Sequence, residues 1–400
     1  MVKIPSEQFA ARIERLKAMM READIQACLV YGDEYRKENL RYVSNYWPLF
    51  ERRATIIPAA GDPIVIAAPE GEKFCREMSV WQDVRLLSEF NCVTVPDQIE
   101  YPMANYTSLT AIYNELCVKS PIRRIGIVGL DAIPVPLMKT IEQSFEGAEL
   151  TDAGDLLFKL RMTKSAHEIA CLQEAARIAD EGYKLMIEQV KPGMTELELA
   201  SLAYGECVRQ GAEHIPFCLL TSGERVHTII GRASNKVIEA GDMIMAAIAV
   251  QVEGYVATLN FPFVAGEMSE QQRAFITLLV DAENLALSHI KAGARQSEVV
   301  LAVKQFFKEN EVTEYDLYPP LHGCGLAEAE SPYPDESSTA VFEAGMTVNT
   351  DVSLFGHPHG SNRIEESLLV TENGYESMSK LVRQLSGTWK TSIGMMGYSE

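Results

Sequence analysis

An internal repeat in the second half of the chain restricts the possible folds more than any other feature. The stretches Val190-Lys191-Pro192-Gly193 and Ile290-Lys291-Ala292-Gly293 begin at positions 190 and 290, and each separates two segments with helical patterns of apolar residues. Each pair of helical segments precedes sequence that is rich in strand-forming residues. Two similar units of this size predict a domain with an internal pseudo-twofold repeat and a cleft along its axis.

Start and stop signals support this repeat. Ser165 and Glu168 form an S-x-x-E capping box, and Pro192-Gly193 ends the helix that this box begins. Thr195 and Glu198 form a second box, which predicts a helix to about residue 210. In the second unit we expect helices at 269–290 and at about 296–310, and strands are expected at 243–264, 346–355 and 363–371.

Residues 1–150 alternate between helix and strand patterns. The sequence IQACLVYG predicts a buried strand, and a Gly-Asp turn joins two strands in RATIIPAAGDPIVIAAP. Further strands are expected at VRLLSEF and RRIGIVG, and helices at 70–79, 105–118 and 135–145. No G-x-G-x-x-G sequence follows a strand, so dinucleotide binding has no support. The predicted fold is α/β with two domains, residues 1–155 and 156–400.

Composition limits the class of function. A chain of 400 residues with 47% hydrophobic and 23% charged residues is typical of a globular protein with two or three domains. The net charge of −20 argues against partners such as nucleic acid or an anionic membrane, since phosphate would be repelled. The acidic charge permits a cationic or zwitterionic small molecule as substrate. Eight cysteines without a CxxC pair, a charged first helix and short apolar runs predict a cytoplasmic protein.

Three polar side chains interrupt the apolar strands of the second domain. His322 is followed by two glycines in LHGCGL, Asp351 interrupts one strand, and Glu365 is expected to point inward from another. An inward carboxylate needs a cation, a metal or a proton held by a raised pKa. Each residue alone is more typical of a structural contact, but together they predict a catalytic or binding site.

From Arg161 onward the chain resembles the pita-bread superfamily of methionine aminopeptidases, prolidases and creatinase. The matching sequences are RMTKSAHEIACLQEAARIAD, KPGMTELELA, the hairpin at 241–255, HGCGL, FEAGMTVNTD and RIEESLLVTENG. The resemblance implies a pita-bread domain at 156–400. It also implies that residues 1–155 form the amino-terminal domain of the creatinase and prolidase branch.

The metallopeptidases of this superfamily hold two metal ions with five side chains, and this chain changes several of them. By resemblance, the two aspartates fall on Ala247 and Thr258. The histidine and the last glutamate are kept as His322 and Glu365, and the other glutamate is Asp351. Since alanine and threonine supply no carboxylate, we expect no dinuclear metal centre and no cofactor. A single divalent metal on His322, Asp351 and Glu365 is the alternative.

Two histidines that handle the substrate amide in these peptidases are also replaced. The same resemblance places them at Ile230 and Ala329. Peptidase activity is therefore not the favoured prediction. Other histidines lie nearby in the sequence: His227 precedes Ile230 by three residues, and His357 and His359 lie in a loop before the Glu365 strand.

Creatinase is a member of the superfamily that works without a metal. By resemblance to it, Glu365 is expected to bind substrate, and a second substrate-binding glutamate is replaced by Asn260. An arginine that reaches the substrate from the partner subunit falls near Arg52 or Arg53. The resemblance therefore implies a homodimer.

The leading hypothesis from the sequence is a metal-independent, creatinase-like hydrolase. It would cleave a C–N bond of a small cationic or zwitterionic compound, such as an amidine or a guanidino compound. Asp351 and Glu365 would attract the cationic group, and His322 or His227 would transfer protons. The alternatives are a single-metal Xaa-Pro-type peptidase, a lyase of the same fold, and a non-catalytic protein that binds a ligand.

Overall fold

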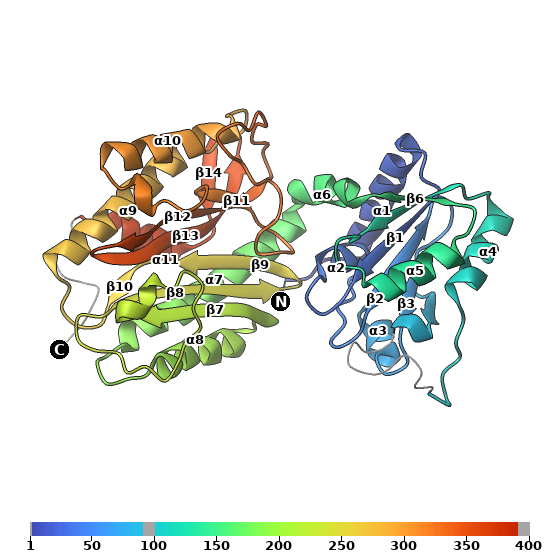
Figure 1. The fold of residues 1–400 in the computed structure, drawn as a ribbon, viewed down its shortest axis with the longest axis horizontal. Helices are drawn as coiled ribbons and strands as arrows, with labels where there is room; N and C mark the ends of the chain where they lie inside the picture. The colour runs from blue at the N-terminus through green and yellow to red at the C-terminus, as the bar shows by residue number, and fades with distance from the viewer. Residues whose placement is uncertain (1, 91–100, 391–400) are drawn as a thin grey trace. The chain divides into compact units, whose positions relative to one another are not determined.

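The computed structural model describes residues 2–90 and 101–390, and the chain divides into two compact units (Figure 1). One unit is Ile4–Arg161, and the other comprises Met162–Glu400 together with Met1–Lys3. Each unit contains helices and a central sheet, so the predicted α/β class is confirmed. None of the helices in the described ranges has both the length and the apolar composition that crossing a membrane requires.

The amino-terminal unit is built on a six-stranded sheet in the order β4-β3-β2-β1-β5-β6. Its strands are β1 (Ala27–Gly32), β2 (Arg53–Pro58), β3 (Ile64–Ala67), β4 (Val84–Leu86), β5 (Arg124–Val128) and β6 (Glu149–Asp152). Its helices are α1 (Ser6–Glu22), α2 (Glu38–Ser44), α3 (Glu72–Met78), α4 (Leu109–Lys119), α5 (Val135–Ser144) and α6 (Gly154–Met162), with a short 3-10 turn at Ser88–Phe90. The patterns in the sequence had not predicted α2, β6 or α6.

Apolar side chains cover both faces of this sheet. Ile64 and Ile66 of β3 belong to one hydrophobic cluster, whereas Val65 and Ala67 belong to another. Successive side chains of a strand point to opposite faces, so an uninterrupted apolar strand needs cover on both sides. This explains why the strands of this unit appear in the sequence as continuous apolar runs.

The carboxy-terminal unit contains an eight-stranded sheet in the order β10-β8-β9-β13-β12-β11, with β7 paired to β8 and β14 paired to β13. The strands are β7 (His214–Ser222), β8 (Met243–Val252), β9 (Tyr255–Asn260), β10 (Phe263–Val264), β11 (Leu321–Gly323), β12 (Thr347–His357), β13 (Gly360–Thr371) and β14 (Gly374–Ser377). The helices are α7 (Ala166–Gln189), α8 (Glu196–Gln210), α9 (Glu270–Ser288), α10 (Gln296–Glu309) and α11 (Lys380–Thr388), with 3-10 turns at Gly223–His227 and Thr313–Tyr315.

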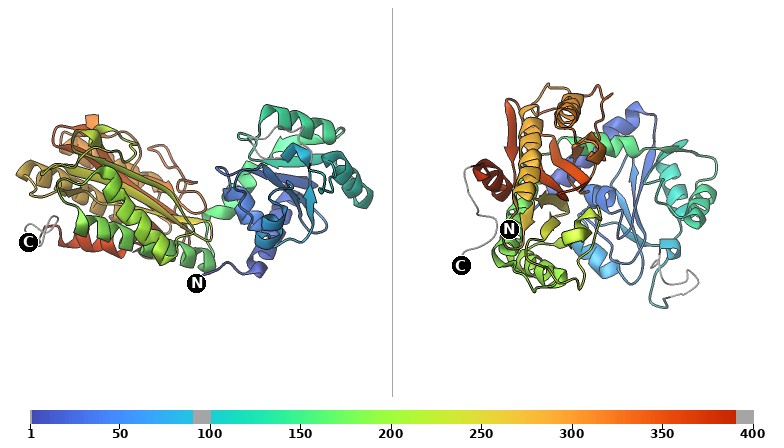
Figure 2. Two further views of the ribbon diagram at one scale, coloured as in Figure 1. Left: turned by 90° about the horizontal axis from the view of Figure 1, so that it is seen from below. Right: turned by 60° about the vertical axis from the view of Figure 1, so that its left-hand side comes forward.

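The predicted internal repeat is visible in this arrangement. One half consists of α7, α8 and strands β7 to β9, and the other consists of α9, α10 and strands β11 to β13 (Figures 1 and 2). α7 packs against β8 and β9, and α9 packs against β12 and β13. The two halves join where β9 pairs with β13. Asn260 of β9 lies opposite Glu365 of β13. The join therefore places Glu365 at the centre of the sheet.

The helix starts follow the capping signals of the sequence. Ser165 with Glu168, and Thr195 with Glu198, form reciprocal capping boxes at the starts of α7 and α8. α9 begins with a further box, in which Ser269 and Gln272 cap each other. Since these hydrogen bonds satisfy backbone groups at the helix ends, the repeat has local as well as tertiary support.

Glu196 fixes the segment between β7 and β8. Its buried carboxylate accepts hydrogen bonds from the backbone N–H and hydroxyl of Ser222, both at 2.9 Å. It also accepts from the backbone N–H and hydroxyl of Ser234, at 3.0 and 2.7 Å, and lies 3.5 Å from the guanidinium of Arg225. One carboxylate therefore holds both ends of the intervening segment in place.

Glu196→Ala is expected to lower the free energy of unfolding by about 3 kcal/mol, because it leaves buried N–H and hydroxyl groups without partners. Urea denaturation of both proteins measures the difference. Glu224→Ala, which removes an exposed carboxylate of the same segment, is the control and should change the denaturation midpoint little. Equal midpoints for the two variants would contradict this role of Glu196.

Candidate functional site

A cavity of about 1030 Å³ opens in the carboxy-terminal unit. One part of its lining is polar and comes from β11, β12, β13 and the loop after β11; these residues are His322, Glu328, Asp351, Arg363 and Glu365. Another part comes from α8, β7 and the segment before β8, and it is mostly apolar. The cavity is large enough for a small peptide or a molecule of similar size.

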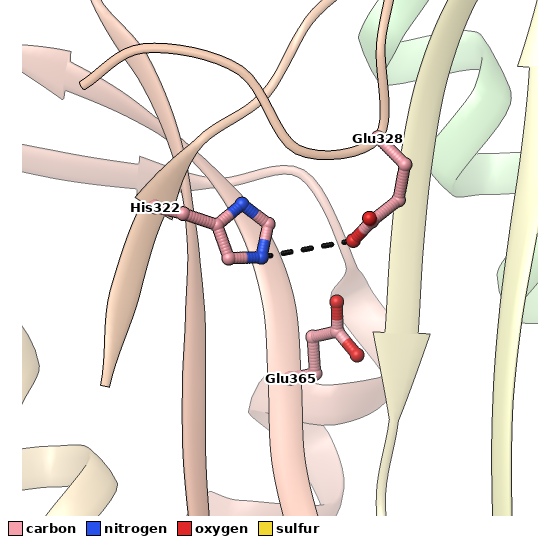
Figure 3. Close-up of side chains that lie close together, drawn as sticks. All are labelled: His322, Glu328 and Glu365. Carbon is pink, nitrogen blue, oxygen red and sulfur yellow. Dashed lines mark ion pairs between the residues drawn. The ribbon is translucent and has the colours of Figure 1, made fainter. Parts of the chain in front are cut away.

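His322, Glu328 and Glu365 form a cluster in this cavity (Figure 3). Nε2 of His322 lies 3.6 Å from Oε1 of Glu328. One nitrogen or oxygen atom from each of the three side chains lies within 4.8 Å of the other two. Figure 3 shows the two carboxylates approaching the imidazole from the loop after β11 and from β13.

Small residues and an ion pair bring Glu328 back towards His322. A Cβ atom at Gly323 would collide with the backbone carbonyl of Ser331, so only glycine allows the chain to return so closely. The buried ammonium of Lys164 lies 3.0 Å from Oε1 of Glu330, and Oε2 of Glu330 accepts from the backbone N–H of Ala327 at 3.3 Å. Glu330 therefore anchors the short loop that carries Glu328.

Asp351 faces a different partner from the one that the sequence suggested. Its Oδ2 lies 3.3 Å from Nη1 of Arg363, and its Oδ1 accepts a hydrogen bond from the Tyr318 hydroxyl at 3.4 Å. In the described part of the chain, the group of side chains that could hold a metal ion contains Glu328 and not Asp351. The set of His322, Asp351 and Glu365 therefore stays a prediction, while the structure groups Glu328 with His322 and Glu365 and pairs Asp351 with Arg363.

Negative charge accumulates around Glu365. This residue is 2% exposed, and burial raises its pKa well above the usual value for a glutamate. The carboxylates of Asp351 and Glu328 raise the pKa further, while Arg363 opposes them. A bound cation would relieve the repulsion between these carboxylates and allow Glu365 to ionise.

The residues fit one divalent cation but not two. One imidazole nitrogen and two carboxylates are the kind of donor set that holds a single catalytic zinc ion with an open position, or a related ion. The positions where the superfamily has aspartates are Ala247 and Thr258, both buried, and neither adds a carboxylate to the cluster. The expected loss of a dinuclear centre is therefore consistent with the side chains present.

Asn260 is fully buried and is not among the residues that line the cavity. Its side-chain nitrogen donates to Oδ1 of Asn362 at 3.0 Å and to the carbonyl of Arg363, and its oxygen accepts from the backbone N–H of Ala246 at 3.0 Å. These bonds tie β8, β9 and β13 together. The predicted contact of Asn260 with substrate stays a prediction, while the structure gives the amide internal partners.

The other candidate histidines lie outside the lining of this cavity. His227 and His359 line a separate cavity of about 690 Å³, where Nδ1 of His227 is 2.7 Å from the Ser361 hydroxyl. The ring of His357 stacks on the ring of Phe275 with the centroids 5.1 Å apart. The ring of Tyr315 contacts it edge-on at a centroid distance of 5.0 Å. His227 therefore lines a different cavity from Ile230, which lines the main one, and its proton-transfer role stays a prediction.

The two candidate arginines belong to the amino-terminal unit. Arg53 is buried, forms an ion pair with Glu51, and donates to the carbonyls of Arg52 and Phe90 at 2.7 and 2.8 Å. A substrate contact for Arg53 is thus disfavoured, because its guanidinium already has internal partners. Arg52 lines a small cavity of about 110 Å³ together with Glu89.

Glu328 was missed by the sequence reasoning. It follows His322 by six residues in the sequence GLAEAESP, at a position where the resemblance assigns no functional residue. The one signal was the pair of alternating glutamates in this loop. Glu330, the other member of the pair, forms an ion pair with Lys164. Glu328 lies instead beside His322 and Glu365.

Family models match both units of the chain. The model of metallopeptidase family M24 matches residues 170–372, and the model of the creatinase/prolidase N-terminal domain matches residues 12–163. The chain belongs to metallopeptidase family M24. The resemblance to the creatinase and prolidase superfamily is confirmed, and family membership supports a hydrolase.

Individual relatives of this M24 protein are peptidases by name. The uncharacterized peptidase YqhT of Bacillus subtilis is 30% identical over 239 residues, which cover 60% of this chain and 68% of the relative. The Xaa-Pro dipeptidase of Pyrococcus furiosus is 26% identical over 290 residues, 72% of this chain and 82% of the relative. The crystal structure of the prolidase from Pyrococcus horikoshii OT3 has a TM-score of 0.79 at 22% identity, covering 92% of this chain and 98% of that one.

These relatives correct the leading hypothesis from the sequence. A metal-independent hydrolase of non-peptide C–N bonds was expected because Ala247, Thr258, Ile230 and Ala329 replace functional residues of the peptidases. The relatives are nevertheless named as Xaa-Pro dipeptidases, and the solved structures with the same fold include prolidases. The proteins to which this chain is similar are therefore named as peptidases, and the leading hypothesis is wrong.

Proposed function

We propose that the chain is an Xaa-Pro-type peptidase that uses one divalent cation held by His322, Glu328 and Glu365. The observation that carries the proposal is the cluster of these three side chains, whose ligand atoms lie within 4.8 Å of one another in a cavity of about 1030 Å³. The similarity to Xaa-Pro dipeptidases over most of their length supports this class of substrate. Neither point requires the two aspartates that this chain lacks.

A divalent cation at this position would polarise the carbonyl of the bond to be cleaved. The protein's own groups have separate tasks. Arg363 is 7% exposed and lines the cavity, so its guanidinium can donate hydrogen bonds to negative charge that develops on the substrate. Asp351 and the carbonyl of Ile229, which accepts from Nη2 of Arg363 at 3.1 Å, hold that guanidinium in one orientation.

The apolar part of the cavity suits the rest of such a substrate. Leu197 and Ala200 of α8 and Pro216, Phe217 and Leu219 of β7 line it. A proline ring and an apolar neighbouring side chain can be buried against these groups. The polar cluster and the apolar wall therefore match the two chemical parts of an Xaa-Pro peptide.

Metal titration tests the proposal. Protein depleted of metal with a chelator should not release proline from leucyl-proline, and activity should return with Zn²⁺, Mn²⁺ or Co²⁺ and saturate at one equivalent per chain. Glu328→Gln should weaken metal binding by about a hundredfold or more, since it removes a ligand charge. Glu343→Gln, an exposed carboxylate outside the cavity, is the matched control and should bind metal normally.

Three outcomes would contradict the proposal. They are full activity without metal, saturation at two equivalents, and normal metal affinity in Glu328→Gln. Binding of leucyl-proline without release of proline, in protein loaded with metal, would instead support the non-catalytic alternative.

A further inference from the structure

Three side chains lie in one row across the strands next to the proposed metal site. His322 of β11 is opposite Asn349 of β12, and Asn349 is opposite Ser367 of β13. Opposite residues of antiparallel strands point to the same face of the sheet, and Ser367 shares that face with Glu365, two residues earlier. Asn349 therefore lies between the imidazole of the proposed site and the hydroxyl of Ser367.

Asn349 and Ser367 are buried, with exposed fractions of 0% and 1%. Neither is among the residues that line the main cavity. Asn349 therefore acts on the site through the side chains that it contacts, and not by contact with a substrate.

A chain of hydrogen bonds fixes the orientation of the Asn349 carboxamide. The backbone N–H of Thr258 donates to Oγ of Ser367 at 3.2 Å. The hydroxyl of Ser367 in turn donates to Oδ1 of Asn349 at 2.6 Å. Since a backbone N–H can only donate, the proton of the Ser367 hydroxyl is directed away from Thr258 and towards Asn349. The carboxamide oxygen thus faces Ser367, and the NH2 group faces the other way.

The NH2 group of Asn349 faces Glu365. Its Nδ2 donates to Oε1 of Glu365 at 3.3 Å. An amide nitrogen donates and does not accept, so the oxygen that faces it has to be the acceptor. The hydrogen bond uses one lone pair of Oε1 and restrains the rotation of the carboxylate, which leaves Oε2 as the freer of the two oxygens.

The surroundings of Glu365 explain why a neutral donor suits this position. Asp351 lies opposite Glu365 on β12, and Glu328 belongs to the same cluster, so negative charge gathers around the carboxylate. Like charges repel, which turns a carboxylate that is free to rotate away from its neighbours. The carboxamide of Asn349 restrains the carboxylate without bringing a charge that would compete with a cation.

From these observations we infer that Asn349 is a positioning residue, which holds Glu365 in the orientation that binds the divalent cation. Ser367 and the backbone of Thr258 set the direction in which Asn349 donates. The inference rests on the proposed function and deepens it, because it names the group that prepares one of the three ligands.

Calorimetric titration of metal-free protein with Zn²⁺ tests the inference without an assay of activity. Asn349→Ala should weaken Zn²⁺ binding by about tenfold or more, the size of effect expected when a group that orients a ligand is lost. Ser367→Ala should weaken binding by a smaller factor, because the carboxamide can then turn its oxygen towards Glu365. The double variant should bind like Asn349→Ala, since Ser367 acts through Asn349.

The visible spectrum of bound Co²⁺ gives a second measurement. In Asn349→Ala both oxygens of Glu365 are free to bind the ion, and an additional ligand atom changes the position and intensity of the absorption bands. An unchanged spectrum would overturn the inference, because the orientation of Glu365 would then not depend on the carboxamide.

Thr350→Val is the matched control from the next position of β12. It removes a buried hydroxyl that donates to Glu283 at 2.7 Å on the opposite face of the sheet. Its affinity for Zn²⁺ should equal that of the wild-type protein, although its stability falls. An equal loss of affinity in Thr350→Val and Asn349→Ala would overturn the inference, because any damage to β12 would then suffice.

The remaining outcomes separate the inference from the proposed function. Normal Zn²⁺ binding in Asn349→Ala, or additive losses in the double variant, would overturn the inference and leave the peptidase proposal standing. A wild-type protein that binds no divalent cation would overturn both. If Asn349→Ala does not fold, Ser367→Ala decides, and unchanged affinity in that variant would overturn the inference.

Discussion

Glu365→Gln is expected to reduce the release of proline from leucyl-proline by about a thousandfold without loss of the folded structure. Glutamine has nearly the same volume as glutamate, and its oxygen can still accept from Nδ2 of Asn349, which lies 3.3 Å from Oε1 of Glu365. The substitution removes a carboxylate from the proposed metal site of His322, Glu328 and Glu365. Activity should therefore fall through loss of the cation and not through loss of packing.

Thermal denaturation separates these two causes. Because burial and two neighbouring carboxylates raise the pKa of Glu365, its ionised form is costly in the metal-free protein. Glu365→Gln should thus leave the melting temperature of metal-free protein unchanged or raise it. The increase in melting temperature that added Zn²⁺ produces in the wild-type protein should disappear.

Glu366→Gln is the matched control from the same strand. Glu366 is opposite Thr350 on β12, whereas Glu365 is opposite Asp351, so the two glutamates point to opposite faces of the sheet. Glu366 forms an ion pair with Arg383 at 2.5 Å, away from the cavity. Glu366→Gln should change stability but retain metal binding. A large loss of stability in Glu365→Gln, with metal binding retained, would make Glu365 a structural residue.

Much of the fold could be predicted because its signals are local. Capping boxes at Ser165 and Thr195 define helix starts whatever the tertiary context, and the repeat of the helical pairs implies two similar halves. The cross-strand pair of Asp351 and Glu365 also follows from two adjacent strands with inward carboxylates. These features depend on residues that are close in sequence or on simple strand alternation.

The composition of the site could be predicted only in part, because the partner of each charged side chain depends on the tertiary structure. Asp351 and Glu328 were equally available to His322 in the sequence, but Arg363 pairs with Asp351 and a glycine-rich turn returns Glu328 to the cluster. His227 is only three residues from Ile230, yet its ring contacts Ser361 at another cavity. Residues that are close in sequence can therefore line different cavities.

The prediction of function failed for a related reason. Losses at Ala247 and Thr258 were weighed as evidence against a dinuclear metal centre and against peptidase activity, and a replacement ligand from a loop was not considered. In the proposed site, Glu328 supplies a carboxylate from outside the positions that the superfamily uses. If the proposed site binds a cation, its ligand set has changed its members while keeping its chemistry, which position-by-position comparison does not detect.

On the opposite face of the sheet, a second buried group of charges predicts unusual dependence of stability on pH. Glu283 of α9 is fully buried, accepts a hydrogen bond from the Thr350 hydroxyl at 2.7 Å, and lies 3.7 Å from Arg383. Burial, together with the nearby Glu366, raises the pKa of Glu283 to about 8. Two carboxyl groups thus share one arginine, and Glu283 keeps its proton at neutral pH.

A raised pKa in the folded state destabilises the protein as pH increases. In the unfolded chain Glu283 loses its proton near its ordinary pKa of about 4.3, whereas the folded protein holds the proton until about pH 8. Between these values the folded state binds more protons. The free energy of unfolding should therefore fall with rising pH, by at most about 1.4 kcal/mol per pH unit from this group.

Glu283→Gln should remove this slope, because glutamine resembles the protonated carboxyl group and does not titrate. Near pH 5 the variant and the wild-type protein should have similar stability, while near pH 8 the variant should be more stable by roughly 3 kcal/mol. Urea denaturation of metal-free protein at intervals between pH 5 and pH 8 measures both curves. Glu309→Gln, an exposed carboxylate of α10, should give a curve parallel to that of the wild-type protein. If Glu283→Gln is also parallel, Glu283 is ionised in the folded state and Arg383 neutralises it.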